Sequence, residues 1–339
     1  MDAILGMLVF SLGGLAGATF LLPARGIKGW AYESWWLVYA FIGLIVCPPV
    51  ICYFTVPDFW HVTTSAPAAV LGRCAGFGAM WGVGALCWGL MVRYLGLGLG
   101  LAIGCGLCAA TGTLIPPIAQ GHAADLVKDT GALIVLGGVI GSLVGIVFVG
   151  LAGKAKEEEL PEEEKKKAVA EFDFKKGIVT AVIAGVFSAG MNFGLQGAEV
   201  IEKAAVEAGA AQCWRGMPVI MVVLWGGFVV ELIWCLQQNL KNKTFGDYAK
   251  IAPRNFLCAS AVGVIWVMQF VCTKFGEPLM GELKYISFAV MMASTIFFST
   301  FIGIMMGEWK GTGPRTKRNL ALGIIILVVS FCAISLGSK

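Results

Sequence analysis

The sequence predicts an all-α membrane protein with ten transmembrane helices, and three observations support this. Of its 339 residues, 58% are hydrophobic and only 14% are charged, whereas about a quarter of the residues of a soluble domain are charged. The apolar residues form ten runs of about 20 residues, the length that crosses a hydrocarbon core. The 46 glycines favour helices that approach each other closely. This pattern excludes a disordered chain, a secreted disulfide scaffold and an ordinary cytosolic enzyme.

The ten predicted spans follow one another with short connections. They cover residues 3–22, 35–54, 67–92, 95–118, 132–152, 177–197, 217–238, 254–274, 285–307 and 320–337. The first run lacks a preceding basic segment and an A-x-A cleavage site, so we expect a retained helix rather than a signal peptide. Paired prolines lie near the ends of the second and fourth runs, where they disturb a helix least.

One long polar stretch, residues 154–176, divides the chain. It contains seven lysines and eight acidic residues, which predicts a solvated cytoplasmic linker. A short helix is expected there, because Glu162/Lys166 and Glu163/Lys167 have i,i+4 spacing. The linker separates a first five-helix half (1–153) from a second (177–339). An odd number of spans per half places the halves in opposite orientations, as in an inverted repeat.

The lysines and arginines predict the orientation in the membrane. Of the 25, 18 fall on one side of the predicted spans and six on the other, with Arg73 inside the third span. The richer side is expected to face the cytoplasm. Both termini, including Lys339, are then periplasmic, in a multi-pass protein of the bacterial inner membrane.

The sequence does not have the residue patterns that disulfide bonds, metal sites or ATP binding require. Nearly all of the 11 cysteines lie within apolar runs, where they are typical packing residues. His61 and His122 are isolated in loops, so no metal site is expected. No GxxxxGK[ST] motif for ATP is present. The sequence predicts no enzyme activity, no cofactor, no nucleic-acid partner and no obligate protein partner.

Polar side chains within the spans are the strongest candidates for function, because each must find a partner or line a wet cavity. In the sixth span, Ser188, Asn192, Gln196 and Glu199 follow helical spacing and predict one polar face. Such a face suits a polyhydroxylated solute. The alternative is hydrogen bonding between helices without a ligand.

Tryptophans within the spans suit sugar rings, because a flat indole stacks on C–H faces and carries an N–H donor. Trp81 and Trp88 share a face of the third span, at a depth unusual for an interfacial tryptophan. In the eighth span, Trp266, Gln269 and Thr273 lie on one side. The sequence therefore predicts that Trp81, Trp88, Trp266 and Gln269 contribute to a solute site.

Two carboxylates are candidates for proton coupling. Glu231 lies about 10 Å deep in the seventh span, on the face that carries Trp234 and Gln238. A carboxyl group buried in this way can exchange a proton near neutrality. Glu33 lies at the start of the second span; the alternative for Glu33 is an interfacial ion pair with Arg25 or Lys28. Arg73 is expected to pair with an acid or to extend toward the interface.

The chain also resembles the L-rhamnose–proton symporters of the drug/metabolite transporter superfamily. Stretches that carry the resemblance include Tyr32–Trp36, Pro57–Trp60, Gly78–Gly82, Met91–Gly96, Gly112–Leu114, Glu171–Gly177, Phe187–Met191, Tyr285–Ser287 and Glu308–Trp309. The resemblance implies two inverted five-helix halves, a central site near the bilayer midplane, and alternating access driven by a proton gradient. Glu33 matches the family's tryptophan-flanked acid, which favours it over Glu231.

We therefore predict a secondary transporter that imports a deoxyhexose, L-rhamnose or a close relative, by proton symport. Its partners are the sugar and the lipid bilayer. Sodium is the alternative coupling ion, and export of amino acids or other metabolites is the alternative function. The predicted substrate-binding residues are Trp81, Trp88, Ser188, Asn192, Gln196, Trp266 and Gln269, and the predicted proton-coupling residues are Glu33 and Glu231.

Overall fold

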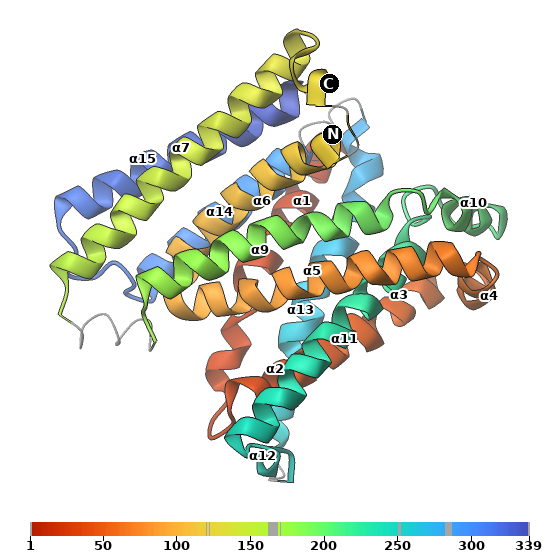
Figure 1. The fold of residues 1–339 in the computed structure, drawn as a ribbon, viewed down its shortest axis with the longest axis horizontal. Coiled ribbons are helices and arrows are strands. Elements are labelled where there is room, and N and C mark those ends of the chain that lie inside the picture. Colours follow the sequence, from red (N-terminus) through yellow and green to blue (C-terminus); the bar gives the residue numbers. More distant parts are fainter. Residues whose placement is uncertain are drawn as a thin grey trace. The chain divides into compact units, whose positions relative to one another are not determined.

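A computed structural model describes residues 2–119, 121, 123–161, 169, 171–249, 252–281 and 287–337. These residues form helices and turns, with no strand among them (Figure 1). The chain divides into two compact units, each built from segments that are distant in sequence. The first unit comprises Met1–Ala18, Gly84–Ala189 and Gly276–Lys339, and the second comprises Thr19–Val83 and Gly190–Phe275.

The helices follow the predicted apolar runs closely. They are α1 (Asp2–Thr19), α2 (Tyr32–Ala40), α3 (Cys47–Thr55), α4 (Phe59–Thr64), α5 (Ala68–Leu95), α6 (Leu97–Ala119), α7 (Thr130–Glu159), α9 (Phe174–Leu195), α10 (Glu199–Glu207), α11 (Met217–Asn242), α12 (Gly246–Ala249), α13 (Pro253–Met280), α14 (Ser287–Met305) and α15 (Pro314–Gly337). Two 3₁₀ turns lie at Leu22–Gly26 and Ala123–Val127. Within the described residues, nine helices are long and apolar enough to cross a membrane. The chain is therefore an all-α, multi-pass membrane protein.

The ninth predicted span falls short of that length. Its described apolar stretch, Val290–Met305, is shorter than the other nine. Residues 282–286, which include Lys284 and Tyr285 of the predicted span and its flank, lie outside the described part of the chain, as do His122 and Lys339.

The second span contains an irregularity that the apolar pattern does not reveal. A π-helical turn, Phe41–Val46, joins α2 to α3. Cys47 and then Pro48 follow, and a proline has no N–H to continue the regular hydrogen-bond ladder. The same turn is also closely packed, because a Cβ on Gly263 of α13 would lie 2.8 Å from the backbone nitrogen of Gly43. Glycine at both positions lets the two backbones meet.

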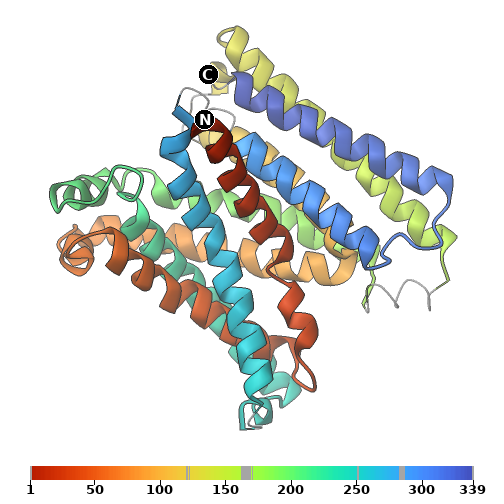
Figure 2. The same cartoon turned by 180° about the vertical axis from the view of Figure 1, so that it is seen from behind.

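Close packing through small residues holds each unit together. In the second unit, a Cβ on Gly82 of α5 would lie 2.6 Å from the carbonyl oxygen of Gly227 on α11. In the first unit, α7 and α15 lie side by side in both views (Figures 1 and 2). A Cβ on Gly138 would lie 2.8 Å from the carbonyl oxygen of Ser330, so no larger side chain fits there. The glycine-rich composition serves helix packing in both units.

The predicted linker is partly wrong in its boundaries and in its solvation. α7 continues through Lys154–Glu159, and Leu160 and Pro161 follow its end. Lys156 is only 1% exposed, with its ammonium 5.0 Å from the Phe172 ring centroid and 4.9 Å from that of Trp309. Cation–π contacts of this kind compensate part of the cost of burial. The predicted pairs Glu162/Lys166 and Glu163/Lys167 lie outside the described residues.

The turn after α14 is fastened to the start of α6 by Glu308. Its two carboxylate oxygens accept hydrogen bonds from the backbone nitrogens of Leu97 at 2.9 Å and Gly98 at 3.0 Å. These nitrogens belong to the first turn of α6, which has no carbonyl partners for them within the helix. A carboxylate also favours this positive end of the helix dipole. Glu308 thus fixes the α14–α15 turn within the first unit.

Candidate functional site

The predicted polar face of the sixth span is shorter than expected. α9 ends at Leu195, so Gln196 lies in the turn that follows and Glu199 begins α10. Gly197 has φ +67°, the left-handed conformation that commonly ends a helix. The guanidinium of Arg73 donates to the carbonyl oxygen of Gly197. The partner of Arg73 is therefore a backbone carbonyl, where an acidic side chain or the interface was expected. Only part of the expected stripe therefore lies on one helix.

Ser188 and Asn192 both lie on α9 but belong to different units. In the first unit, the Ser188 hydroxyl donates to the carbonyl oxygen of Ala184 on its own helix at 2.6 Å. In the second unit, Asn192 and Gln196 are exposed. Trp88, like Ser188, belongs to the first unit. A Cβ on Gly104 of α6 would lie 3.1 Å from its ring, so Trp88 packs closely there.

In the second unit, the structure brings Trp81 and Trp266 together. Their ring centroids are 5.7 Å apart, although the residues come from α5 and α13. The side-chain nitrogen of Gln269 donates to the carbonyl oxygen of Trp266 at 3.1 Å, which fixes the amide beside that indole. Trp81 is 8% exposed, whereas Trp266 and Gln269 are half-buried. Three of the predicted sugar-binding residues thus lie close together.

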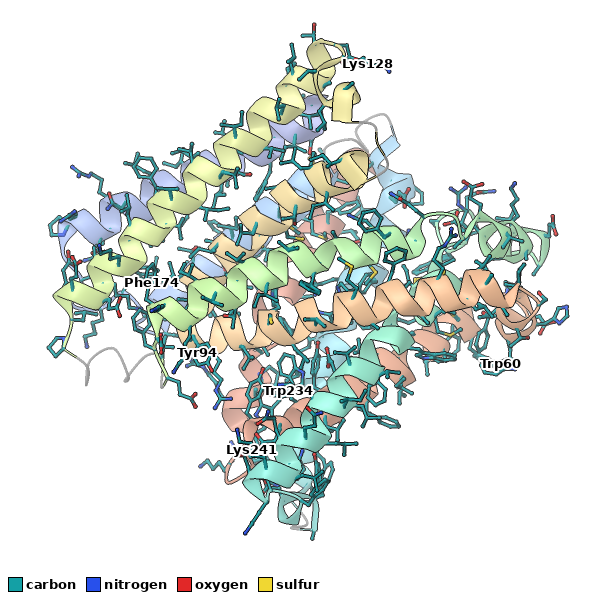
Figure 3. All side chains as sticks on the ribbon, viewed as in Figure 1. Trp60, Tyr94, Lys128, Phe174, Trp234 and Lys241 are labelled. Carbon is teal, nitrogen blue, oxygen red and sulfur yellow. The ribbon has the colours of Figure 1, made fainter. Side chains whose placement is uncertain are left out.

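A continuous series of aromatic rings extends from this pair to α2 and α11. The centroid separations are 6.4 Å for Tyr39–Trp266, 4.6 Å for Trp36–Tyr39, 5.1 Å for Tyr32–Trp36 and 6.2 Å for Tyr32–Trp234. We call Trp81, Trp266, Tyr39, Trp36, Tyr32 and Trp234 the aromatic series. Figure 3 labels Trp234 on α11. Trp36 and Tyr39 were not predicted as site residues, although both are aromatic residues with a polar group within the predicted second span.

Glu231 lies beside the middle of the aromatic series. It is 0% exposed, and neither carboxylate oxygen has a hydrogen-bond partner among the described residues. The Trp36 indole N–H is the donor beside this carboxylate, and the Tyr39 phenol lies near enough to interact with it electrostatically. Neither the Trp36 N–H nor the carboxylate forms a hydrogen bond of ordinary geometry within the described residues. A fully buried carboxylate with one indole beside it is costly when charged, so this group is suited to hold a proton or to bind a polar ligand.

Glu33 has very different surroundings. Its Oε1 accepts hydrogen bonds from the side-chain nitrogen of Asn242 at 2.8 Å and from the hydroxyl of Thr244 at 3.0 Å. It forms no ion pair within the described residues, so the alternative partners Arg25 and Lys28 are not used. Sequence reasoning did not find Asn242 and Thr244, because more than 200 residues separate them from Glu33.

The hydrogen-bond network around Glu33 extends along the ends of α2 and α11. The Ser34 hydroxyl lies 3.2 Å from Asn239 Oδ1 and 3.0 Å from Asp247 Oδ2. Asp247 also accepts from the backbone nitrogen of Ala31 at 2.8 Å, in the turn before α2. Burial raises the pKa of Tyr248, whose hydroxyl lies 3.3 Å from the Asn239 side-chain nitrogen. This network joins the start of α2 to the segment after α11.

No group of three His, Cys, Asp or Glu side chains in the described part of the chain is arranged to hold a metal. The site therefore consists of indoles, phenols, amides and one fully buried carboxylate. Such groups can stack on a sugar ring, hydrogen-bond its hydroxyls and carry a proton.

Comparison with known proteins agrees with this chemistry. A family model described as L-rhamnose-proton symport protein matches residues 1–339. The L-rhamnose-proton symporter of Cronobacter sakazakii is 32% identical over 340 residues, which cover 98% of this chain and 97% of the relative. That of Pectobacterium carotovorum is 32% identical over 341 residues, 98% of each chain, and that of Shigella sonnei is 31% identical over 340 residues, 98% and 97%. The chain belongs to the L-rhamnose-proton symport protein family, a family of transporters.

Proposed function

We propose that this protein imports L-rhamnose together with a proton by alternating access. The observation that carries the proposal is Glu231, fully buried beside the aromatic series, in a chain that matches the symporter family over its whole length. A sugar site needs flat apolar faces and hydrogen-bonding groups, and a symporter needs a group that changes protonation. The second unit contains both kinds of group.

We place the sugar against Trp81 and Trp266, with Gln269 as a hydrogen-bonding partner. The separation of 5.7 Å between the two ring centroids supports a shared surface. Trp88, Ser188, Asn192 and Gln196 complete the proposed binding residues. The Ser188 hydroxyl donates to its own helix, and its oxygen has lone pairs that can accept from a sugar hydroxyl.

Of the two proposed proton-coupling residues, hydrogen bonding favours Glu231. Glu33 accepts hydrogen bonds from two side chains. Glu231 is fully buried with only the Trp36 indole N–H beside it. Protonation removes the cost of burying its charge, and sugar binding offers hydroxyl donors to the ionised form. This link between the two ligands is the physical basis of symport.

The proposed architecture has ten spans in two inverted five-helix halves, residues 1–153 and 177–339. The cytoplasmic stretch 154–176 joins them, and its first residues, Lys154–Glu159, continue α7. The nine described spans, with α14 as the tenth, support this count. The distribution of lysine and arginine supports periplasmic termini in a bacterial inner membrane. A reporter fused at the C-terminus that is active only in the cytosol would contradict this topology.

Uptake into proteoliposomes tests the function. We expect an inward proton gradient to drive accumulation of labelled L-rhamnose, and a sodium gradient alone to leave it unchanged. A panel with another 6-deoxyhexose and several amino acids tests selectivity. Accumulation driven by sodium, or transport of amino acids without L-rhamnose, would contradict the proposal.

A further inference from the structure

The first unit contains a cavity between α14 and α15. Its volume is about 620 Å³, and it lies next to the turn that joins the two helices. The lining includes the apolar side chains Ile304 and Met305 of α14 and Leu320 and Ile324 of α15. Neither the aromatic series nor either proton-coupling candidate contributes to it. The cavity is therefore separate from the proposed sugar site.

One end of the cavity is basic. Lys310 in the turn and Lys317 in the first turn of α15 both line it, and both are exposed. Neither forms an ion pair with another described residue. The nearby acids have other partners: Glu308 binds the start of α6, and Glu159 accepts from the backbone nitrogen of Gly313 and the hydroxyl of Thr316, both at 2.8 Å. The positive charge of the two lysines is thus uncompensated.

Other residues that line the cavity are apolar and exposed. Met305 is 73% exposed and Ile304 is 57% exposed. In a membrane, such side chains lie among acyl chains. The lining thus combines two basic side chains with exposed apolar side chains, which matches the two parts of a phospholipid.

We propose that this cavity binds an anionic phospholipid. Lys310 and Lys317 contact the headgroup phosphate, and an acyl chain lies against Ile304 and Met305. Basic pockets between transmembrane helices on the cytoplasmic side are suited to anionic headgroups, and the positive-inside pattern places this turn on that side. An ammonium group provides a compact charge with three donors for phosphate oxygens.

Native mass spectrometry of the purified protein, titrated with phosphatidylglycerol or phosphatidylcholine, tests the proposal. We expect phosphatidylglycerol to bind the Lys310→Gln/Lys317→Gln variant about 30-fold more weakly than the unmodified protein, because each lysine near an anionic surface contributes about 1 kcal/mol. The matched control is Lys154→Gln/Lys175→Gln, which removes two exposed lysines of the same unit outside the cavity. Its binding should be unchanged.

A second variant tests the cavity itself without altering charge. Ala321 lines the cavity and is exposed, so Ala321→Phe fills space that the lipid would occupy. We expect this variant to lose phosphatidylglycerol binding as well. Equal losses in the control variant, equal binding of phosphatidylcholine, or competition by inorganic phosphate at the same concentration would overturn the proposal. So would a second copy of the chain cross-linked through α15 in place of lipid.

Discussion

Glu33 and Glu231 are both buried carboxylates of the second unit, yet their surroundings are opposite. Glu33 is 6% exposed and accepts hydrogen bonds from Asn242 and Thr244. Glu231 is 0% exposed and has no hydrogen-bond partner among the described residues. Burial alone therefore does not distinguish a structural carboxylate from one that changes protonation; the supply of donors does.

Because the two carboxylates differ in their hydrogen bonds, we expect substitution of Glu33 to lower stability and substitution of Glu231 to abolish proton coupling. Asn242 and Thr244 hydrogen-bond Glu33, so this side chain joins α2 to the segment after α11. Glu231 is fully buried with only the Trp36 indole N–H beside it, so its charge state depends on what binds nearby. Four variants test this comparison, in order of decreasing expected effect.

Glu231→Gln should give the largest effect, a loss of proton-driven accumulation. At a membrane potential of 100 mV, one charge carried inward is worth about 2.3 kcal/mol, or about 50-fold in concentration. We expect the variant to equilibrate L-rhamnose without accumulating it, as measured by tracer uptake in proteoliposomes. Sugar exchange at equal pH serves as the control for folding and should persist. Accumulation at the unmodified level would remove Glu231 from the coupling step.

Glu33→Ala should affect stability instead. We expect the free energy of unfolding to fall by about 2 kcal/mol, because two side-chain donors lose a charged acceptor. Thermal denaturation in detergent measures this change. Glu33→Gln keeps an acceptor oxygen and should recover most of the stability while leaving proton-driven uptake intact. If Glu33→Gln instead abolishes accumulation, the roles of the two carboxylates are the reverse of those proposed.

Gln269→Ala tests the sugar side of the site. We expect L-rhamnose binding to weaken about tenfold, since a hydrogen bond in a binding site contributes about 1.4 kcal/mol. Isothermal titration of the purified protein measures the affinity. Gln237→Ala, on the exposed face of α11, is the matched control and should bind normally. Unchanged affinity in Gln269→Ala would exclude this amide from the site.

Ser34→Ala should give the smallest effect and tests the network behind Glu33. The serine hydroxyl lies within hydrogen-bonding distance of Asn239 and Asp247, so its loss should lower the free energy of unfolding by about 1 kcal/mol. Proton-driven uptake should not change. If the Ser34→Ala and Glu33→Ala losses combine less than additively, the two residues belong to one network; full additivity would separate them.

The fold was largely predictable because helix formation in a membrane depends on long apolar runs, which are local in sequence. Three features that the runs do not reveal depend on single residues. They are the π turn before Pro48, the end of α9 at Leu195 before Gly197, and the continuation of α7 to Glu159. Lys156 is another such feature, because a lysine in a charged stretch is expected to be exposed to solvent. Its burial depends on Phe172 and Trp309, which lie elsewhere in the chain.

The candidate site was less predictable, because its contacts join distant segments. Trp81, Trp266 and Gln269 were each identifiable as unusual residues within spans, but their proximity depends on the packing of α5 against α13. The donors to Glu33 come from the end of α11, and the neighbours of Glu231 come from α2. No single-sequence pattern connects such pairs. The family resemblance favoured Glu33 as the proton-coupling residue, whereas the hydrogen bonds in the structure favour Glu231 for that role.

The most direct test of the account is the proton movement that accompanies sugar entry. When L-rhamnose is added to proteoliposomes without a buffer or an imposed gradient, the unmodified protein should carry protons inward and make the external medium more alkaline. We expect Glu231→Gln to abolish this pH change and Glu33→Gln to retain it. A pH change that persists in Glu231→Gln, or its absence in the unmodified protein, would contradict proton coupling through Glu231.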